Sequence, residues 1–320
     1  MQRLEFRAMG CQMLAIVDSE DAGASEAMAQ VPGWFEEWEL SLSRFRNDSE
    51  LSALNAADGK PFRVSETMWQ VLKVAMRAAG SSNGLVVPTM LDALQTAGYD
   101  RSFESLEAST VSASALNLKP AANWRQIKLD ANTQTVRLPR WMHLDFGGVA
   151  KGWAADQAVR RLSTIAPALV DAGGDIAISA VRANGEPWPI AVADPIHPDA
   201  DLEMLMVTHG GVATSGRDYR RWQHNGKWQH HIIDPRTGSP AETDVMSVTV
   251  IAPTTVLAEV AAKVALILGS QKGLQWIEAR TELAGLLVLE GGQILRSRRM
   301  NDYVVSESDQ GPMSLSPAWS

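Results

Sequence analysis

Cysteine is almost absent from this 320-residue chain, which contains only Cys11. A single cysteine excludes an intrachain disulfide and any zinc site built on several cysteines. Basic residues are outnumbered, with 29 Lys and Arg against 37 Asp and Glu, and the formal net charge is −8. Because a nucleic-acid surface requires a basic patch, we expect no nucleic-acid partner.

Long apolar runs are missing as well. The most apolar stretch, residues 245–268, is interrupted by Pro253, Glu259 and Lys263, so it is not expected to span a membrane. The first eight residues include charged side chains and lack the apolar centre of a signal peptide. As the chain stands we expect a cytoplasmic protein, exported only if an N-terminal signal has been removed. The oligomeric state is left open.

The chain does contain segments with helical spacing and segments with strand-like runs. Helices are expected over 24–42, 64–79, 150–162 and 254–268, a hairpin over 124–138, and strands over 4–17, 168–170, 176–181, 190–193, 246–252 and 283–289. This mixed order with hairpins favours an α+β fold over a doubly wound parallel sheet. The length fits one domain over 1–320 or two closely joined lobes. The serine-rich tail, about 306–320, is expected to be disordered.

Two adjacent histidines, His230 and His231, lie on a short β-branched stretch that breaks into a turn over 234–240. Turns at strand ends are places where a rigid scaffold presents reactive groups. The alternative is a pair of packed or solvated histidines beside an ordinary turn. Ser215 as a nucleophile with His231 as its base would make a hydrolase, although the nucleophile-elbow signature is missing.

A glycine-rich loop over 144–152 is expected to follow a strand and open a helix. Its amides could bind an anion such as a diphosphate, and Lys151 adds a cation where the helix dipole disfavours one. A glycine-rich turn without function is the alternative. A second such loop, 171–175, has the composition of a tight turn whose glycines take positive φ. Glu259 and Lys263 are four residues apart, and spacing alone favours an ion pair.

Six segments of the chain, taken together and in order, resemble segments of the FAD:protein FMN transferase family, the ApbE-like proteins. The matching segments are 7–11, 42–51, 145–156, 171–175, 214–216 and 230–240. The resemblance implies an α+β fold related to the T-fold, in which helices pack on mixed sheets. It also implies an enzyme that binds FAD with Mg²⁺, transfers FMN to a Thr or Ser hydroxyl of an acceptor flavoprotein, and releases AMP.

The resemblance also assigns roles to residues of this chain. His231 would take the proton of the acceptor hydroxyl. Lys151 and the amides of the 147–152 turn would hold the diphosphate. Phe45, where the family has tyrosine, would stack on a flavin or adenine ring. The remaining FAD-binding positions would be Met9, Val87, Pro88, Thr89, Asp145, Gly173, Gly174 and Ile233.

The sequence departs from the family pattern at positions that the resemblance implies bind the metal ion. The implied metal-binding positions are Gly148 and Glu259, with Lys263 replacing the expected threonine ligand, and Val87 replaces an expected aspartate. A lysine ammonium cannot ligate a hard cation. Our hypothesis is that Lys263 occupies the place of the ion as a tethered positive charge, which makes the protein less dependent on Mg²⁺ or catalytically weak.

These departures support two alternatives to a transferase. One is a flavin-binding protein without transfer activity, acting as a carrier or scaffold. The other is an FAD diphosphatase, in which water replaces the acceptor hydroxyl and the products are FMN and AMP.

Overall fold

The computed structural model describes residues 1–304 except 102–120, 122, 198, 218–220 and 225–226, and the predicted disordered tail at 306–320 lies outside the described residues. The helices are α1 (Ala22–Leu42), α2 (Glu50–Asn55), α3 (Glu66–Ser81), α4 (Leu91–Thr96), α5 (Ala150–Leu162), α6 (Thr255–Leu268) and α7 (Ser270–Glu278). The strands are β1 (Gln2–Ala8), β2 (Cys11–Val17), β3 (Phe62–Arg63), β4 (Lys128–Asp130), β5 (Thr135–Arg137), β6 (Ala168–Ala172), β7 (Asp175–Ile178), β8 (Trp188–Ala193), β9 (Asp201–Val207), β10 (Gly210–Gly216), β11 (Arg221–His224), β12 (Lys227–His230), β13 (Ile233–Asp234), β14 (Ser239–Pro240), β15 (Val245–Ala252), β16 (Ala284–Leu289) and β17 (Ile294–Arg296).

The main sheet has eight strands in the order β1-β2-β6-β7-β10-β15-β16-β17. Every neighbouring pair in it is antiparallel. The prediction of an α+β fold is therefore confirmed, because a doubly wound fold requires parallel neighbours joined by crossover helices.

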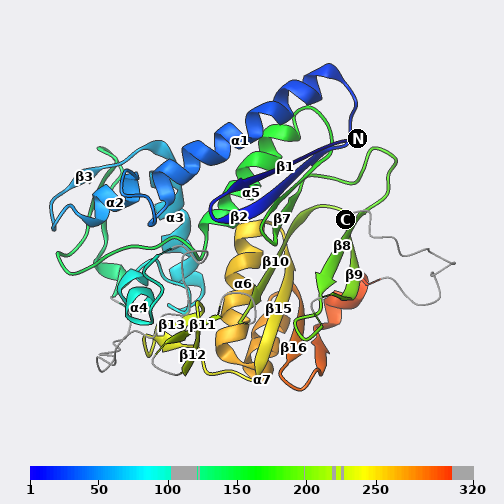
Figure 1. Cartoon of the computed structure of the whole chain (residues 1–320). Coiled ribbons are helices and arrows are strands. Elements are labelled where there is room, and N and C mark those ends of the chain that lie inside the picture. The colour runs from blue at the N-terminus through cyan, green and yellow to red at the C-terminus, as the bar shows by residue number, and fades with distance from the viewer. Residues whose placement is uncertain (102–120, 122, 198, 218–220, 225–226, 305–320) are drawn as a thin grey trace.

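Helices α1, α5, α6 and α7 cover one face of this sheet, and the β8–β9 hairpin covers the other (Figure 1). Successive side chains of β2 illustrate the division. Met13 and Ala15 pack with the residues of α1 and α5, whereas Ile16 packs with Trp188 and Leu205 of the hairpin. This alternation follows from the two-residue period of a strand. None of the helices in the described part of the chain combines the length and apolar character needed to cross a membrane.

Serine caps set the starts of two helices. The Ser65 hydroxyl accepts a hydrogen bond from the Met68 amide at 3.2 Å, so α3 begins just after it. Ser49 caps α2 in the same way through the Ser52 amide at 3.0 Å. The α5 helix has the predicted bounds.

The N-terminal prediction of one strand over 4–17 is wrong, because the segment forms two strands. A turn at Met9 and Gly10, with φ values of 50° and 67°, joins β1 to β2. Apolar residues continue on both sides of this turn, and it has no proline or asparagine to mark it. Gly10 was therefore the only signal of the reversal in the sequence.

Strand β10, at the centre of the sheet, was not predicted as a strand because three of its seven residues are glycine. Tertiary packing explains the composition. A Cβ on Gly211 would lie 2.2 Å from the Thr255 backbone nitrogen, so only glycine lets α6 begin directly against this strand. Strand β9 and helix α7 were also not predicted, and no strand directly precedes Leu144 as the sequence had suggested.

Candidate functional site

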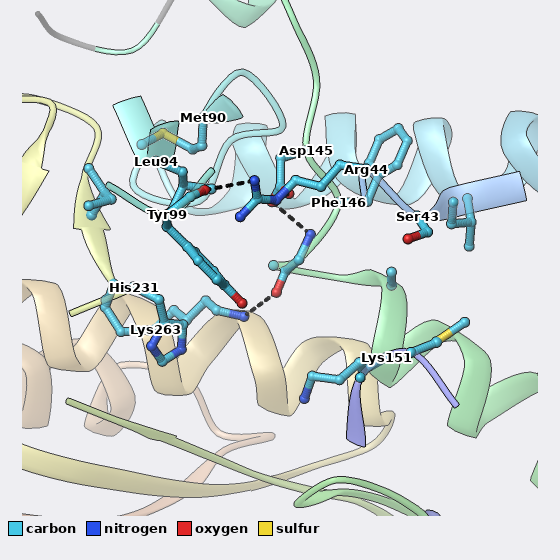
Figure 2. Close-up of a pocket in the computed structure, with 18 of the residues that line it drawn as sticks. Ser43, Arg44, Met90, Leu94, Tyr99, Asp145, Phe146, Lys151, His231 and Lys263 are labelled. Carbon is cyan, nitrogen blue, oxygen red and sulfur yellow. Dashed lines mark hydrogen bonds and ion pairs between the residues drawn. The ribbon is translucent and has the colours of Figure 1, made fainter. Parts of the chain in front are cut away.

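Segments that are distant in the sequence enclose a cavity of about 470 Å³ on the helical side of the main sheet. Its lining comes from the β1–β2 turn, the residues after α1, the loop before α4, the start of α5, the segment between β12 and β13, and α6 (Figure 2). This volume lies in the range typical of sites for small ligands. Of the residues singled out in the sequence, those that line it are Met9, Phe45, Val87, Asp145, Gly148, Lys151, His231, Ile233 and Lys263.

The other predicted site residues lie behind this lining. The Pro88 carbonyl accepts a hydrogen bond from the Asp145 amide at 2.8 Å, and Thr89 is buried beside it. Gly173 and Gly174 form the β6–β7 turn with φ values of 67° and 91°, the positive values expected of a tight turn. These residues and Glu259 are absent from the cavity lining, so any effect on a ligand passes through neighbours.

Two ion pairs form one side of the site, which we call the charged wall: Lys151 with Asp175, and Lys263 with Glu259. The side chain of Asp175 is only 3% exposed. Burial raises its pKa to about 6, against the opposing effect of the Lys151 charge. Burial lowers the pKa of Lys151, but the charges of Asp175 and Glu259 outweigh it, so this pKa lies above its ordinary value. The Lys151 ammonium is therefore charged at neutral pH.

The second pair is tied to the glycine-rich loop. Lys263 Nζ donates to Glu259 Oε1 at 2.9 Å and to the Gly147 carbonyl at 3.1 Å, the contact drawn in Figure 2. The Gly152 amide donates to Glu259 Oε2 at 3.1 Å. The predicted (i, i+4) ion pair is thus confirmed, and the loop carbonyl that it meets belongs to Gly147 and not to Gly148.

Close packing of α5 against α6 holds this arrangement. A Cβ on Gly152 would lie 2.9 Å from Glu259 Oε2 and 3.0 Å from the Val256 nitrogen, so a larger residue would separate the two helices. Asp156 of α5 also accepts hydrogen bonds from the amides of Thr255 and Val256 at the start of α6. These contacts fix the position of Lys263 relative to the start of α5.

The side chains at this point do not fit the Mg²⁺ that the family resemblance implies. Both oxygens of Glu259 already accept N–H groups, and an ammonium contacts the Gly147 carbonyl. Mg²⁺ prefers six oxygen ligands in octahedral geometry. In the part of the chain that the structure describes, no group of three or more His, Cys, Asp and Glu side chains is arranged to hold a metal ion.

The two adjacent histidines have different environments. His231 lines the cavity, whereas the His230 ring lies between backbone groups. The Ile232 amide donates to His230 Nδ1 at 3.3 Å, so Nε2 carries the proton and donates to the Ala241 carbonyl at 3.2 Å. Burial lowers the pKa of His230 to about 4. His230 therefore anchors the hairpin, and His231 alone of the two can act on a ligand.

The serine-hydrolase alternative fails on geometry. Ser215 is 5% exposed and lies within β10, opposite Val248 of β15. It does not line the cavity that contains His231. A buried hydroxyl inside the central sheet cannot attack a ligand in that cavity.

The opposite side of the site, which we call the aromatic wall, consists of Phe45 and Tyr99 with the guanidinium of Arg44, and Trp222 packs behind Tyr99 outside the cavity lining. The Arg44 guanidinium carbon lies 4.1 Å from the Phe45 ring centroid and 4.5 Å from that of Tyr99. The Tyr99 and Trp222 centroids are 5.3 Å apart, and Trp222 Nε1 donates to the Ala97 carbonyl at 2.8 Å. This wall therefore ties the loop after α4 to the hairpin next to His231.

Arg44 was not predicted as a site residue, although it lies in the matched 42–51 segment. Arg44 Nε pairs with Asp145 Oδ2 at 2.9 Å, and Nη1 donates to the Tyr99 carbonyl at 2.9 Å. Its side chain is 5% exposed, and Nη2 has no hydrogen-bond partner among the described residues. The match of residues 42–51 to the family pattern was an available signal for Arg44, which is the second residue after α1. No local pattern in the sequence marked Tyr99 or Trp222 as part of the site.

The α+β fold and the cavity described above, with a charged wall facing an aromatic wall, define a protein suited to a ligand that carries both phosphate and aromatic rings. A sequence model of the ApbE family matches residues 9–287. The chain belongs to the ApbE family, which confirms the resemblance found in its motifs.

Relatives and solved structures agree with this membership. The chain is 30% identical over 316 residues to a curated FAD:protein FMN transferase of Treponema pallidum, covering 92% of this chain and 85% of the relative. Identity to the FAD:protein FMN transferase of Salmonella typhimurium is 28%, with 96% and 91% covered. The crystal structure of the ApbE protein from Thermotoga maritima superposes with a TM-score of 0.85 at 26% identity, covering 95% of this chain and 99% of that one.

Proposed function

We propose that this protein is an FAD:protein FMN transferase that acts on a Thr or Ser hydroxyl of an acceptor flavoprotein. The observation that carries the proposal is the meeting of His231 and Lys151 in one cavity with the aromatic wall. A proton acceptor, a phosphate-binding cation and ring surfaces are the three elements that this reaction requires. The family membership and the names of the curated relatives support the same activity.

In this proposal His231 accepts the proton of the acceptor hydroxyl. The hydroxyl oxygen forms a bond to the phosphorus of the FMN half of FAD. The bond from that phosphorus to the bridging oxygen breaks, and AMP leaves with the electron pair. Lys151 and Lys263 line the cavity and would face the charge that develops on the phosphate oxygens. The amides of Gly147 and Gly152 already donate to carboxylates of the protein, so the two ammonium groups carry this task.

The rings of FAD would lie against the aromatic wall. Phe45 is 44% exposed, so one face of its ring is available to a flavin or an adenine. Met9, Val87 and Ile233 supply apolar surface around it, and Asp145 supplies a carboxylate held by Arg44. Pro88, Thr89, Gly173 and Gly174 would act indirectly, by holding the Asp145 loop and the turn beside Lys151.

A direct test is to incubate the purified protein with FAD and a flavin-acceptor domain. We expect the acceptor mass to increase by one FMN, with AMP released in equal amount. FAD binding without any mass increase would favour the carrier or scaffold alternative. Release of FMN and AMP in the absence of acceptor would favour the diphosphatase.

A further inference from the structure

Lys263 places a positive charge in the wall of the cavity, where it is held by two oxygens of the protein. Its ammonium has three N–H groups, and two of them reach Glu259 Oε1 and the Gly147 carbonyl. The third has no hydrogen-bond partner in the described part of the chain. Lys263 also lines the cavity (Figure 2), and its side chain is 15% exposed. The spare N–H group is thus available to an oxygen of a bound ligand.

The same contacts leave no room for a divalent ion. Glu259 is 2% exposed, and its two oxygens are engaged by Lys263 and by the Gly152 amide. An ion bound at about 2.1 Å from these oxygens would have to displace the lysine from them. It would also lie beside a displaced positive charge in a poorly solvated region, where repulsion is strong.

The net charge of the charged wall differs from the net charge that it would have with a bound divalent ion. Lys151 with Asp175, and Lys263 with Glu259, form two neutral pairs. A divalent ion in place of the ammonium would leave one additional positive charge. The lysine therefore offers a weaker attraction for a diphosphate, but one that is always present.

We propose that the Lys263 ammonium binds the diphosphate of FAD directly and makes FAD binding independent of divalent metal. This inference rests on the proposed function, because it takes FAD as the ligand. It assigns to a side chain the task for which the family resemblance implies a metal. Three experiments test it, and each measures binding, so the outcome does not depend on transferase activity.

The first experiment titrates FAD and ADP into the wild-type protein in excess EDTA and in excess MgCl₂. We expect each dissociation constant to change by less than about twofold between the two conditions. A loss of about tenfold or more in EDTA overturns the inference while leaving the proposed function intact. If FAD fails to bind under both conditions, the proposed function fails as well.

The second experiment compares Lys263→Met with Lys272→Met, a matched control at an exposed position on α7 outside the cavity lining. Loss of a charged hydrogen bond should weaken FAD and ADP binding by about tenfold or more. Riboflavin, which has no phosphate, should bind both variants like the wild type. Unchanged ADP binding in Lys263→Met, or an equal loss for riboflavin, overturns the inference.

The third experiment restores oxygen ligands with the double variant Glu259→Asp/Lys263→Thr. We expect ADP to bind this variant about tenfold more tightly in MgCl₂ than in EDTA, since the ammonium no longer occupies the two oxygens. Absence of any Mg²⁺ response in the folded double variant overturns the claim that Lys263 excludes the metal.

Discussion

The charged wall and the aromatic wall of the cavity are built differently. The charged wall stands on regular elements: Lys151 on α5, Asp175 on β7, and Glu259 with Lys263 on α6. Its carboxylates are almost completely buried. The aromatic wall stands mainly on connecting segments, with Phe45 after α1 and Tyr99 after α4.

This difference separates two tasks within one site. Buried ion pairs on packed helices hold the phosphate-binding groups in place before a ligand arrives. An exposed ring on a connecting segment can adjust to the ring of a ligand at small cost. We therefore expect mutations in the charged wall to affect both stability and phosphate binding, and mutations in the aromatic wall to affect mainly ring binding.

The largest effect should come from His231, which the hairpin next to the aromatic wall brings into the cavity. His231→Gln removes the proposed base, so the rate of FMN transfer should fall about 10²- to 10⁴-fold. FAD affinity should stay within about twofold of the wild type. His209→Gln, at an exposed position outside the cavity lining, is the matched control. An unchanged transfer rate in His231→Gln would show that another group takes the proton.

The charged wall is tested by Lys151→Met, which leaves the buried Asp175 carboxylate without its cation. Urea unfolding should show a loss of about 3–5 kcal/mol. The double variant Lys151→Met/Asp175→Asn should recover most of this stability without recovering ADP binding. Lys128→Met, on the exposed face of β4, serves as the control. A loss below about 1 kcal/mol in the single variant would contradict the view that this pair holds the wall together.

The role of His230 as an anchor of the hairpin can be tested by measuring the free energy of unfolding as a function of pH. The pKa of His230 falls from 6.5 to about 4 in the folded protein. The unfolded chain therefore binds more protons between these values, and the stabilising contribution present above pH 6.5 is lost as pH falls towards 4. We expect the free energy of unfolding to fall by about 2–3 kcal/mol over this window from His230 alone.

Unfolding of His230→Gln at several pH values isolates this contribution. The glutamine amide can still donate to the Ala241 carbonyl but does not titrate, so the pH dependence should be flatter than in the wild type. The matched control is His209→Gln, at an exposed position outside the cavity lining, which keeps His230 and should therefore keep a steeper pH dependence than His230→Gln. Identical profiles for wild type and His230→Gln would refute the role of the buried ring.

The smallest effect is expected at Phe45. Phe45→Ala should weaken FAD binding about two- to tenfold through loss of ring stacking. The melting temperature should change little, because the ring is 44% exposed. Trp141→Ala, at a ring that is 58% exposed and outside the cavity lining, should leave FAD binding unchanged. A large loss of stability in Phe45→Ala would show that the aromatic wall is as rigid as the charged wall.

Local patterns in the sequence were sufficient for most of the regular elements. The helical spacing over 150–162 and over 64–79 corresponds closely to α5 and α3. Strand β10 was not predicted because its glycines allow close packing against α6. A local sequence pattern carries no information about a helix that is distant in the sequence.

The sequence by itself determined the α+β class, the family and the segments that form the site. Only the tertiary structure decided that His231 and not His230 faces the cavity, that Arg44 joins Asp145 to the aromatic rings, and that Lys263 contacts Gly147. The physical reason is the range of the interactions involved. Helix periodicity and capping act over a few residues, whereas Lys263 and Gly147 are 116 positions apart and meet only because α5 packs against α6.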